Sequence, residues 1–127
     1  MINKKTKFLV IDDDYATLVL VKATLTKRGY TDIDVFQDSQ KASVALSTNS
    51  YDVLILDLYM PKIDGFTLLQ QISHSDNPMP CIIAMTAHAE QENKIRALEL
   101  GAKTVLTKPF DINLFVQEVE LQITQLN

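Results

Sequence analysis

Apolar residues along the chain gather in short runs that polar stretches separate. The central run, Val53–Leu56, leads directly into Asp57 and is followed by Pro61 and Gly65. A short unbroken apolar run bounded by turn residues indicates a strand buried on both faces, which is typical of a parallel sheet covered by helices. Pro61 cannot extend a ladder, and Gly65 can adopt backbone angles that other residues avoid. We therefore expect Asp57 at the end of a buried strand, with the following loop folded back over its carboxylate.

Four further segments have the pattern of strands: Phe8–Ile11, Ile33–Phe36, Cys81–Met85 and Lys103–Leu106. Helical periodicity fills the intervals between strands. The inward-facing stripes are expected at Leu18, Val21 and Leu25, at Ala42, Ala45 and Leu46, at Phe66, Leu69 and Ile72, at Ile95 and Leu98, and at Phe115, Val119, Ile123 and Leu126. Asp38 or Ser39 is expected to cap the second helix, and Asp111 the last. The repeated strand-helix alternation predicts an α/β fold in one domain over residues 1–127, with a parallel sheet, right-handed crossovers and helices on both faces.

Composition narrows the class of protein. The chain has 127 residues, of which 46% are apolar and 22% charged, and a net charge of −4. A negative balance disfavours direct nucleic-acid binding, no apolar run approaches the roughly 20 residues of a membrane helix, and the start lacks the apolar core of a signal peptide. The single Cys81 lies in an apolar run, so we expect a buried, unreactive thiol. These features predict a cytoplasmic protein that contacts neither nucleic acid nor membrane directly.

Residues capable of chemistry follow four of the five apolar runs. They are Asp12, Asp13 and Asp14, then Asp57, Thr86 and Lys108. Because the carboxyl ends of parallel strands meet at one edge of the sheet, these side chains are expected to converge there. Each alone has a structural explanation: Asp14 as a helix cap, Asp12 or Asp13 as a turn residue, Thr86 as a cap or turn hydroxyl, Lys108 as a solvated cation, and the nearby His88 as a surface residue. Their joint placement favours a site.

The chemistry of such a site follows from its charges. Two carboxylates about 4 Å apart repel by on the order of 4 kcal/mol at an effective dielectric of 20, so either one holds a proton or a cation lies among them. An all-oxygen site suits Mg²⁺. Lys108 would add a positive charge and Thr86 a hydroxyl donor for a phosphoryl group. Asp57 is the best candidate nucleophile, since carboxylates can carry a covalent phosphoryl group.

The segments FLVIDDD, LDLYMPKIDG, MTAHA and LTKPF together resemble the receiver domain of two-component response regulators over the whole chain. This resemblance implies a flavodoxin-like, three-layer α/β fold with five helices and a five-stranded parallel sheet in the order 2-1-3-4-5. It also implies that Asp57 accepts a phosphoryl group from a histidine kinase or a histidine phosphotransfer domain. The domain would catalyse only its own phosphorylation and dephosphorylation, and the modification would switch the binding of a downstream effector protein.

The resemblance also assigns individual roles. Asp13, Asp57 and the carbonyl of Tyr59 would hold Mg²⁺, with Asp12 acting through water, and Thr86 and Lys108 would contact the phosphoryl oxygens. Tyr59 and His88, two positions after Asp57 and Thr86, would flank the phosphoryl group and shield it from water. The Lys108-Pro109 bond is expected to be cis. Val105 stands where the family usually has Tyr or Phe, so the signal is expected to pass through backbone shifts around residues 87–89.

The residues leave two other functions open. The first is a phosphohydrolase of the haloacid dehalogenase type, because Asp12-x-Asp14 is similar to the opening motif of those enzymes. Two features argue against this function. Lys108 is followed by Pro109 and Phe110 rather than by acids, and the chain has no room for a substrate cap. The second is a scaffold of the same fold that receives no phosphate. The chain would be either a free-standing receiver or a piece of a longer protein. The resemblance to receiver domains implies output through the fourth helix, fifth strand and fifth helix.

Overall fold

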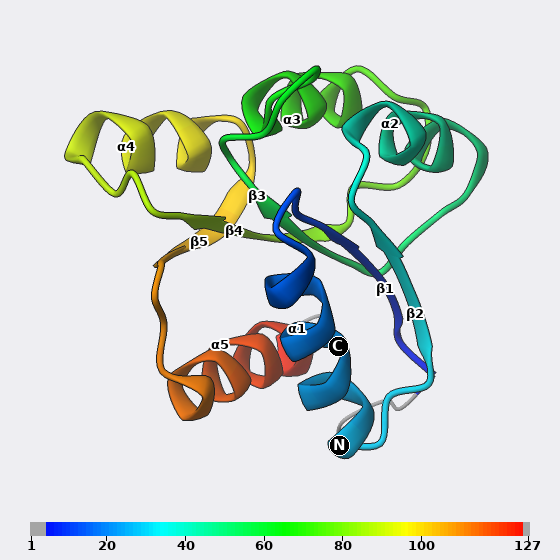
Figure 1. The fold of residues 1–127 in the computed structure, drawn as a ribbon. Coiled ribbons are helices and arrows are strands. Elements are labelled where there is room, and N and C mark those ends of the chain that lie inside the picture. Colours follow the sequence, from blue (N-terminus) through cyan, green and yellow to red (C-terminus); the bar gives the residue numbers. More distant parts are fainter. Residues whose placement is uncertain (1–4, 126–127) are drawn as a thin grey trace.

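The computed structural model describes residues 5–125, in which helices and strands alternate along the chain (Figure 1). The elements are β1 (Lys7–Ile11), α1 (Tyr15–Lys27), β2 (Asp32–Phe36), α2 (Ser39–Thr48), β3 (Val53–Asp57), α3 (Gly65–Ser73), β4 (Cys81–Thr86), α4 (Gln91–Glu99), β5 (Ala102–Thr107) and α5 (Ile112–Thr124). Each expected strand and helix is present, and no strand end differs from the expectation by more than one residue. Among the described residues, no helix is both long enough and apolar enough to span a membrane.

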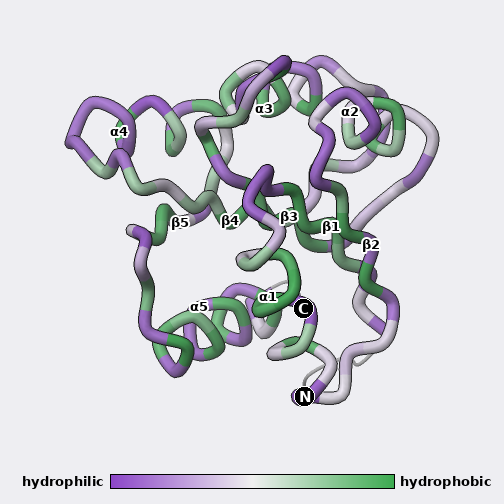
Figure 2. The backbone as a smooth tube through the Cα atoms, in the orientation of Figure 1, coloured by the Kyte–Doolittle hydropathy of each residue, from purple (hydrophilic) through white to green (hydrophobic). Residues whose placement is uncertain are grey.

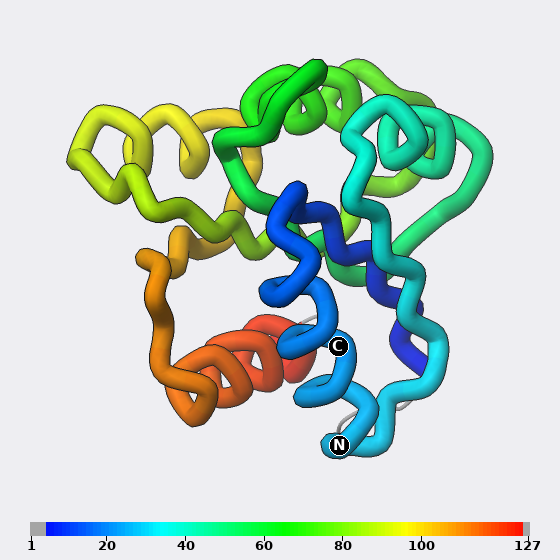
Figure 3. Tube along the Cα trace, in the orientation of Figure 1, coloured from blue at the N-terminus to red at the C-terminus, as the bar shows by residue number. Residues whose placement is uncertain are grey.

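The strands form one sheet in the order β2-β1-β3-β4-β5, and every neighbouring pair is parallel. The α/β fold and the strand order implied by the family resemblance are therefore confirmed. Helices α1 and α5 lie side by side on one face of the sheet, and α2, α3 and α4 cover the other (Figures 1 and 3). The central strands β1, β3 and β4 are thus buried on both faces, as their unbroken apolar sequences require.

Two apolar layers hold the helices to the sheet, because alternate residues of each strand point to opposite faces. Phe8 and Ile55 pack toward α1 and α5 together with Phe115, whereas Leu9 and Leu54 pack toward the other three helices. Figure 2 accordingly shows the central strands β1, β3 and β4 coloured mostly as hydrophobic. Burial of each such side chain contributes roughly 1.5–3 kcal/mol to folding.

Aspartates begin four of the five helices: Asp14, Asp38, Asp64 and Asp111 each accept hydrogen bonds from the backbone of the first turn. A cap of this kind contributes about 1 kcal/mol. The second helix is capped by Asp38, and Ser39 is its first residue. Cys81 is buried as expected, and burial raises the pKa of its thiol, which keeps the sulfur protonated and unreactive.

The prediction that Ile95 and Leu98 form the buried face of the fourth helix is wrong. Ile95 and Leu98 are 45% and 49% exposed, and Ala97 is the residue of α4 that is buried. Figure 1 shows the reason: α4 extends beyond the β5 end of the sheet, so only a narrow face of the helix meets the sheet. The expected stripe on the last helix is confirmed for Phe115, Val119 and Ile123, while Leu126 lies outside the described residues.

Candidate functional site

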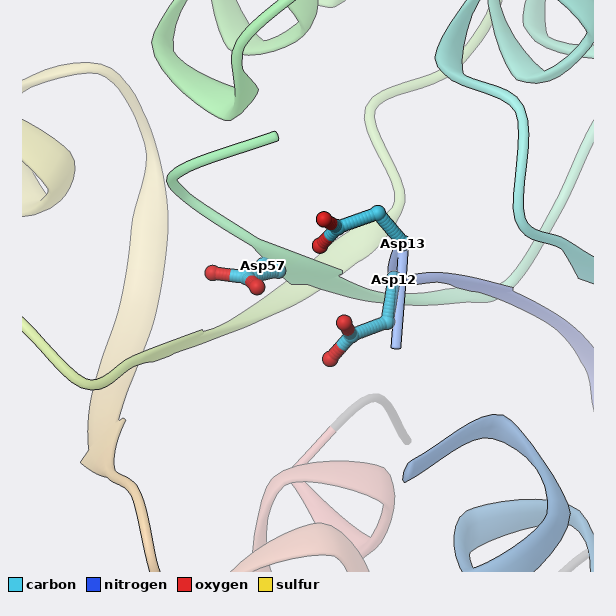
Figure 4. A group of neighbouring side chains, drawn as sticks. All are labelled: Asp12, Asp13 and Asp57. Carbon is cyan, nitrogen blue, oxygen red and sulfur yellow. The ribbon is translucent and has the colours of Figure 1, made fainter. Parts of the chain in front are cut away.

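The polar residues that follow the apolar runs do meet at one edge of the sheet. Asp12 follows β1, Asp57 and Thr86 are the last residues of β3 and β4, and Lys108 follows β5. Figure 4 shows the Asp12 and Asp13 carboxyl groups projecting from the end of β1 toward the side on which Asp57 lies. Carboxylate oxygens of these three residues lie within 4.8 Å of one another. The remaining acid, Asp14, instead caps α1 by accepting a hydrogen bond from Ala16 N–H at 3.1 Å.

Lys108 contributes the positive charge of this cluster. Its Nζ atom donates to Oδ2 of Asp12 at 2.5 Å and to Oδ2 of Asp57 at 3.1 Å. Burial lowers the pKa of Lys108, but the hydrogen bond and charge of Asp12, followed by those of Asp57, outweigh burial and leave the pKa raised. The side chain therefore remains an ammonium group throughout the neutral range.

One ammonium group does not balance the negative charge of the cluster. Asp12 is fully buried, and burial raises its pKa to about 6, with a further contribution from the charge of Asp57; hydrogen bonds from Lys108 and from the Asp14 N–H oppose the rise. Three carboxylates against one cation leave a site that attracts a second cation. The donors are all oxygen, and Asp13 is exposed to solvent, so the residues fit Mg²⁺, which prefers carboxylates and retained waters.

The loop after β3 folds back over Asp57, as expected, but for a different reason. The N–H of Tyr59 donates to Oδ1 of Asp57 at 3.1 Å, and Gly65 N–H donates to the Leu58 carbonyl at 2.9 Å. The positive-φ glycines of the described chain are Gly29 and Gly101, not Gly65. A Cβ atom on Gly65 would lie 2.5 Å from the Asp57 carbonyl oxygen and 2.7 Å from Leu58 Cα. Close backbone packing, rather than an unusual backbone angle, therefore requires glycine here.

Thr86 is fully buried at the end of β4. Its Oγ1 atom accepts a hydrogen bond from the His88 N–H at 2.8 Å, and its carbonyl accepts one from the Lys108 N–H at 2.8 Å. The hydroxyl and the ammonium group are thereby held on neighbouring strands. The Lys108-Pro109 bond is cis, which confirms the expectation, and Val105 packs against the apolar layer beneath α2, α3 and α4.

Two rings lie at the mouth of the site. Tyr59 is 42% exposed and His88 is also exposed, and their ring centroids are 4.7 Å apart in an edge-to-face arrangement. Both residues were expected beside Asp57 and Thr86, and the structure brings their rings together. The ring pair is exposed and lies on the two loops that follow Asp57 and Thr86.

Three polar residues that brace the site were not expected from the sequence. Gln37 Nε2 donates to the Asp13 carbonyl at 3.0 Å, and Ser39 Oγ donates to the Pro61 carbonyl at 2.9 Å. Asn93 of α4 accepts a hydrogen bond from the Tyr59 hydroxyl at 2.8 Å. Each contact joins segments that are distant in sequence, and no motif or periodicity along the chain signals such a contact.

Comparison with known proteins agrees with this geometry. The family model for the response regulator receiver domain matches residues 8–120. The chain is 35% identical over 104 residues to the alkaline phosphatase synthesis transcriptional regulatory protein PhoP of Bacillus subtilis, which covers 82% of this chain and 42% of that protein. The chain spans half or less of the length of the curated relatives it matches.

Solved structures give the same result. The receiver domain of the Francisella response regulator 1452 is similar with a TM-score of 0.87 and 32% identity, covering 97% of this chain and 100% of that one. The receiver domain of sensor histidine kinase PA1611 from Pseudomonas aeruginosa, a structure with a magnesium ion coordinated in its active site cleft, has the same fold with a TM-score of 0.82 and 24% identity, covering 94% of this chain and 98% of that one. The chain described here belongs to the response regulator receiver domain family.

Proposed function

We propose that residues 1–127 act as one phosphoacceptor domain, in which Asp57 receives a phosphoryl group from a phosphohistidine on a histidine kinase or a histidine phosphotransfer domain. The observation that carries this proposal is the position of the Asp57 carboxylate, which lies 3.1 Å from the Lys108 ammonium and within 4.8 Å of two further carboxylates. A carboxylate beside an ammonium group can act as a nucleophile toward phosphorus, because the cation offsets the repulsion between the carboxylate and the phosphoryl oxygens.

The transfer step exchanges one bond to phosphorus for another. A carboxylate oxygen of Asp57 forms the new O–P bond while the P–N bond of the donor breaks, and the electron pair of that bond stays with the imidazole nitrogen. Lys108 and the Thr86 hydroxyl supply a charge and a hydrogen-bond donor for the phosphoryl oxygens. The Thr86 hydroxyl accepts a hydrogen bond from the His88 N–H, and its own proton is left to donate to a phosphoryl oxygen.

The residues proposed to hold Mg²⁺ are Asp13, Asp57 and the backbone carbonyl of Tyr59, with Asp12 acting through water. Their support is the clustering of the three carboxylates and the family to which the chain belongs. When bound, the ion neutralises charge that develops on the phosphoryl oxygens during transfer. Asp12 also holds the Lys108 ammonium in position through the 2.5 Å hydrogen bond.

Tyr59 and His88 are proposed to lengthen the life of the phosphorylated state by keeping water from the phosphorus atom. Hydrolysis needs a water molecule placed for attack, and the two exposed rings pair on the loops that directly follow Asp57 and Thr86. The variant His88→Ala should therefore lose its phosphoryl group faster than the wild-type domain, and an unchanged rate would remove His88 from this role.

The consequence of phosphorylation is proposed to be altered binding of an effector protein. Thr86 and the His88 N–H lie at the start of the segment that leads into α4, so movement of the hydroxyl disturbs the backbone at residues 87–89. Helix α4 also presents Ile95 and Leu98 to solvent. Residues 87–89 and α4 therefore form the most direct route by which phosphorylation of Asp57 would alter the protein surface.

A small donor with a P–N bond, phosphoramidate, tests this function without a cognate partner. With Mg²⁺ present, the domain should take up phosphoryl groups in a stoichiometric reaction, and the variant Asp57→Asn should take up none, while Asp76→Asn, in an exposed loop, should behave as the wild type. Continuous turnover of a small phosphomonoester would instead indicate a phosphohydrolase. Equal uptake by the Asp57→Asn variant would contradict the proposal.

A further inference from the structure

We propose that Asn93 is a positioning residue that holds the Tyr59 ring against His88, beside the site, and thereby slows hydrolysis of the phosphorylated state. This inference rests on the proposed function, in which Asp57 carries the phosphoryl group. Asn93 lies in the first turn of α4 and belongs to none of the segments that carry the family resemblance.

All the polar atoms of the Asn93 side chain are engaged. Oδ1 accepts the hydrogen bond from the Tyr59 hydroxyl at 2.8 Å, and Nδ2 donates to the His88 carbonyl and to Oε2 of Glu90, both at 3.0 Å. The two acceptors fix the direction of the amide nitrogen, so the amide oxygen must face the phenol. The side chain is therefore oriented to receive the Tyr59 hydroxyl before any phosphoryl group arrives.

These hydrogen bonds form a continuous network that connects the ends of strands β3 and β4. Tyr59 N–H donates to Asp57 at the end of β3, and His88 N–H donates to Thr86 at the end of β4. Asn93 joins Tyr59 to His88, and so links the carboxylate that would be phosphorylated to the hydroxyl that would contact the phosphoryl group. The ring of Tyr59 is packed at the same time between His88 and Phe66, with centroid distances of 4.7 Å and 5.8 Å.

The hydroxyl bond matters because Tyr59 is 42% exposed. An exposed side chain samples several rotamers unless a specific contact selects one, and in other rotamers the ring would leave the mouth of the site. Loss of one hydrogen bond of ordinary strength changes such a rotamer equilibrium by roughly three- to tenfold. A comparable acceleration of hydrolysis is expected when either partner of the Tyr59–Asn93 bond is removed.

A double-mutant cycle tests this role. The wild-type domain and the variants Tyr59→Phe, Asn93→Ala and the two combined are phosphorylated with acetyl phosphate and Mg²⁺, freed of donor, and followed by intact mass as the phosphoryl group is lost. Each single variant should lose it about three- to tenfold faster than the wild type, and the combined variant should be no faster than either. Asn113→Ala, also in the first turn of a helix but in α5, is the control and should keep the wild-type rate.

Three outcomes decide between the claims. If the wild-type domain takes up no phosphoryl group, the proposed function fails and this inference fails with it. If the wild type is phosphorylated and Asn93→Ala loses the group at the wild-type rate, only the positioning role is overturned. The positioning role is also overturned if Asn93→Ala accelerates the loss as strongly in the Tyr59→Phe background as alone, because Asn93 would then act without Tyr59.

Discussion

The Nζ atom of Lys108 lies 2.5 Å from Oδ2 of Asp12, although the strands that precede the two residues, β5 and β1, are not neighbours in the sheet. The lysine side chain extends past the ends of β4 and β3 and contacts Asp57 on the way. Lys108 therefore connects the ends of β5 and β1 and also contacts Asp57, the carboxylate that is proposed to react. This pairing holds a cation next to Asp57.

Removal of this cation should impair phosphoryl uptake more than folding. In Lys108→Met, the phosphoryl oxygens lose a charged donor, and loss of one such group typically lowers the rate on the order of a hundredfold. Uptake from acetyl phosphate, followed by intact mass, measures the effect. Lys103→Met, on the exposed side of β5, is the matched control and should retain the wild-type rate; an unimpaired Lys108→Met variant would exclude the lysine from the transfer step.

Asp13→Asn should have opposite effects on stability with and without Mg²⁺. Without the ion, the substitution relieves repulsion among three clustered carboxylates and should raise the melting temperature. With Mg²⁺ at about ten times its Kd, the wild type should gain about 1.4 kcal/mol, and the variant should lose most of this gain. Asp14→Asn is the control, since Asp14 caps α1 and Asn caps nearly as well; a full Mg²⁺ response in Asp13→Asn would contradict the proposed ligand set.

Gly65→Ala should destabilise the domain by about 1–3 kcal/mol, the usual cost of forcing an extra methyl group into a filled space. The added Cβ would meet backbone atoms of Asp57 and Leu58 at 2.5 Å and 2.7 Å, and backbone cannot turn aside as a flexible side chain would. Urea unfolding measures the loss. Thr67→Ala, at an exposed position of the same helix, should cost far less, and equal costs would show that the close approach carries no strain.

The expectations from sequence were most accurate where a pattern reports burial directly. Unbroken apolar runs identified β1, β3 and β4, and the parallel arrangement then brought Asp12, Asp57 and Lys108 to one edge. The alternation of strands and helices was sufficient for the fold class. These features depend on local composition and on the rule that parallel strands end on the same side.

Other features could not be predicted from the sequence because they depend on the tertiary packing of each element. Ile95 and Leu98 have helical spacing, yet both are exposed because α4 extends beyond the sheet. The Tyr59–Asn93 hydrogen bond joins residues 34 positions apart, and only the packing of α4 beside the β3–α3 loop brings the two together. The need for glycine at position 65 likewise arises from tertiary contact with β3, which the sequence alone does not reveal.

The far end of the molecule provides a pH prediction that does not involve the site. Burial raises the pKa of Tyr30 to about 12, and the carboxylate of Glu120 adds to the rise. A raised pKa of this kind contributes stability that is fully present below the unfolded-state pKa of about 10 and is lost as the pH rises toward about 12. By about pH 11 this loss is on the order of 1 kcal/mol, in addition to that from other groups.

The variant Tyr30→Phe removes this ionisation and isolates its effect. Urea unfolding at neutral pH and at about pH 11 should show that the variant loses less free energy of unfolding than the wild type across this interval. Its stability at neutral pH should change by about 1 kcal/mol or less, since the Tyr30 hydroxyl lies 3.3 Å from Oε2 of Glu120. Identical losses in both proteins would mean that Tyr30 ionises as freely in the folded state as in the unfolded chain.

The central claim, that Asp57 is the phosphoacceptor, is tested most directly by intact mass after incubation with acetyl phosphate and Mg²⁺. In that reaction an Asp57 carboxylate oxygen bonds to phosphorus and acetate leaves, so the wild-type chain should gain the mass of one phosphoryl group. The gain should be absent from Asp57→Asn and should fall sharply when a chelator removes the metal. A wild-type chain that gains no mass, or an Asp57→Asn chain that gains as much as the wild type, would contradict the account.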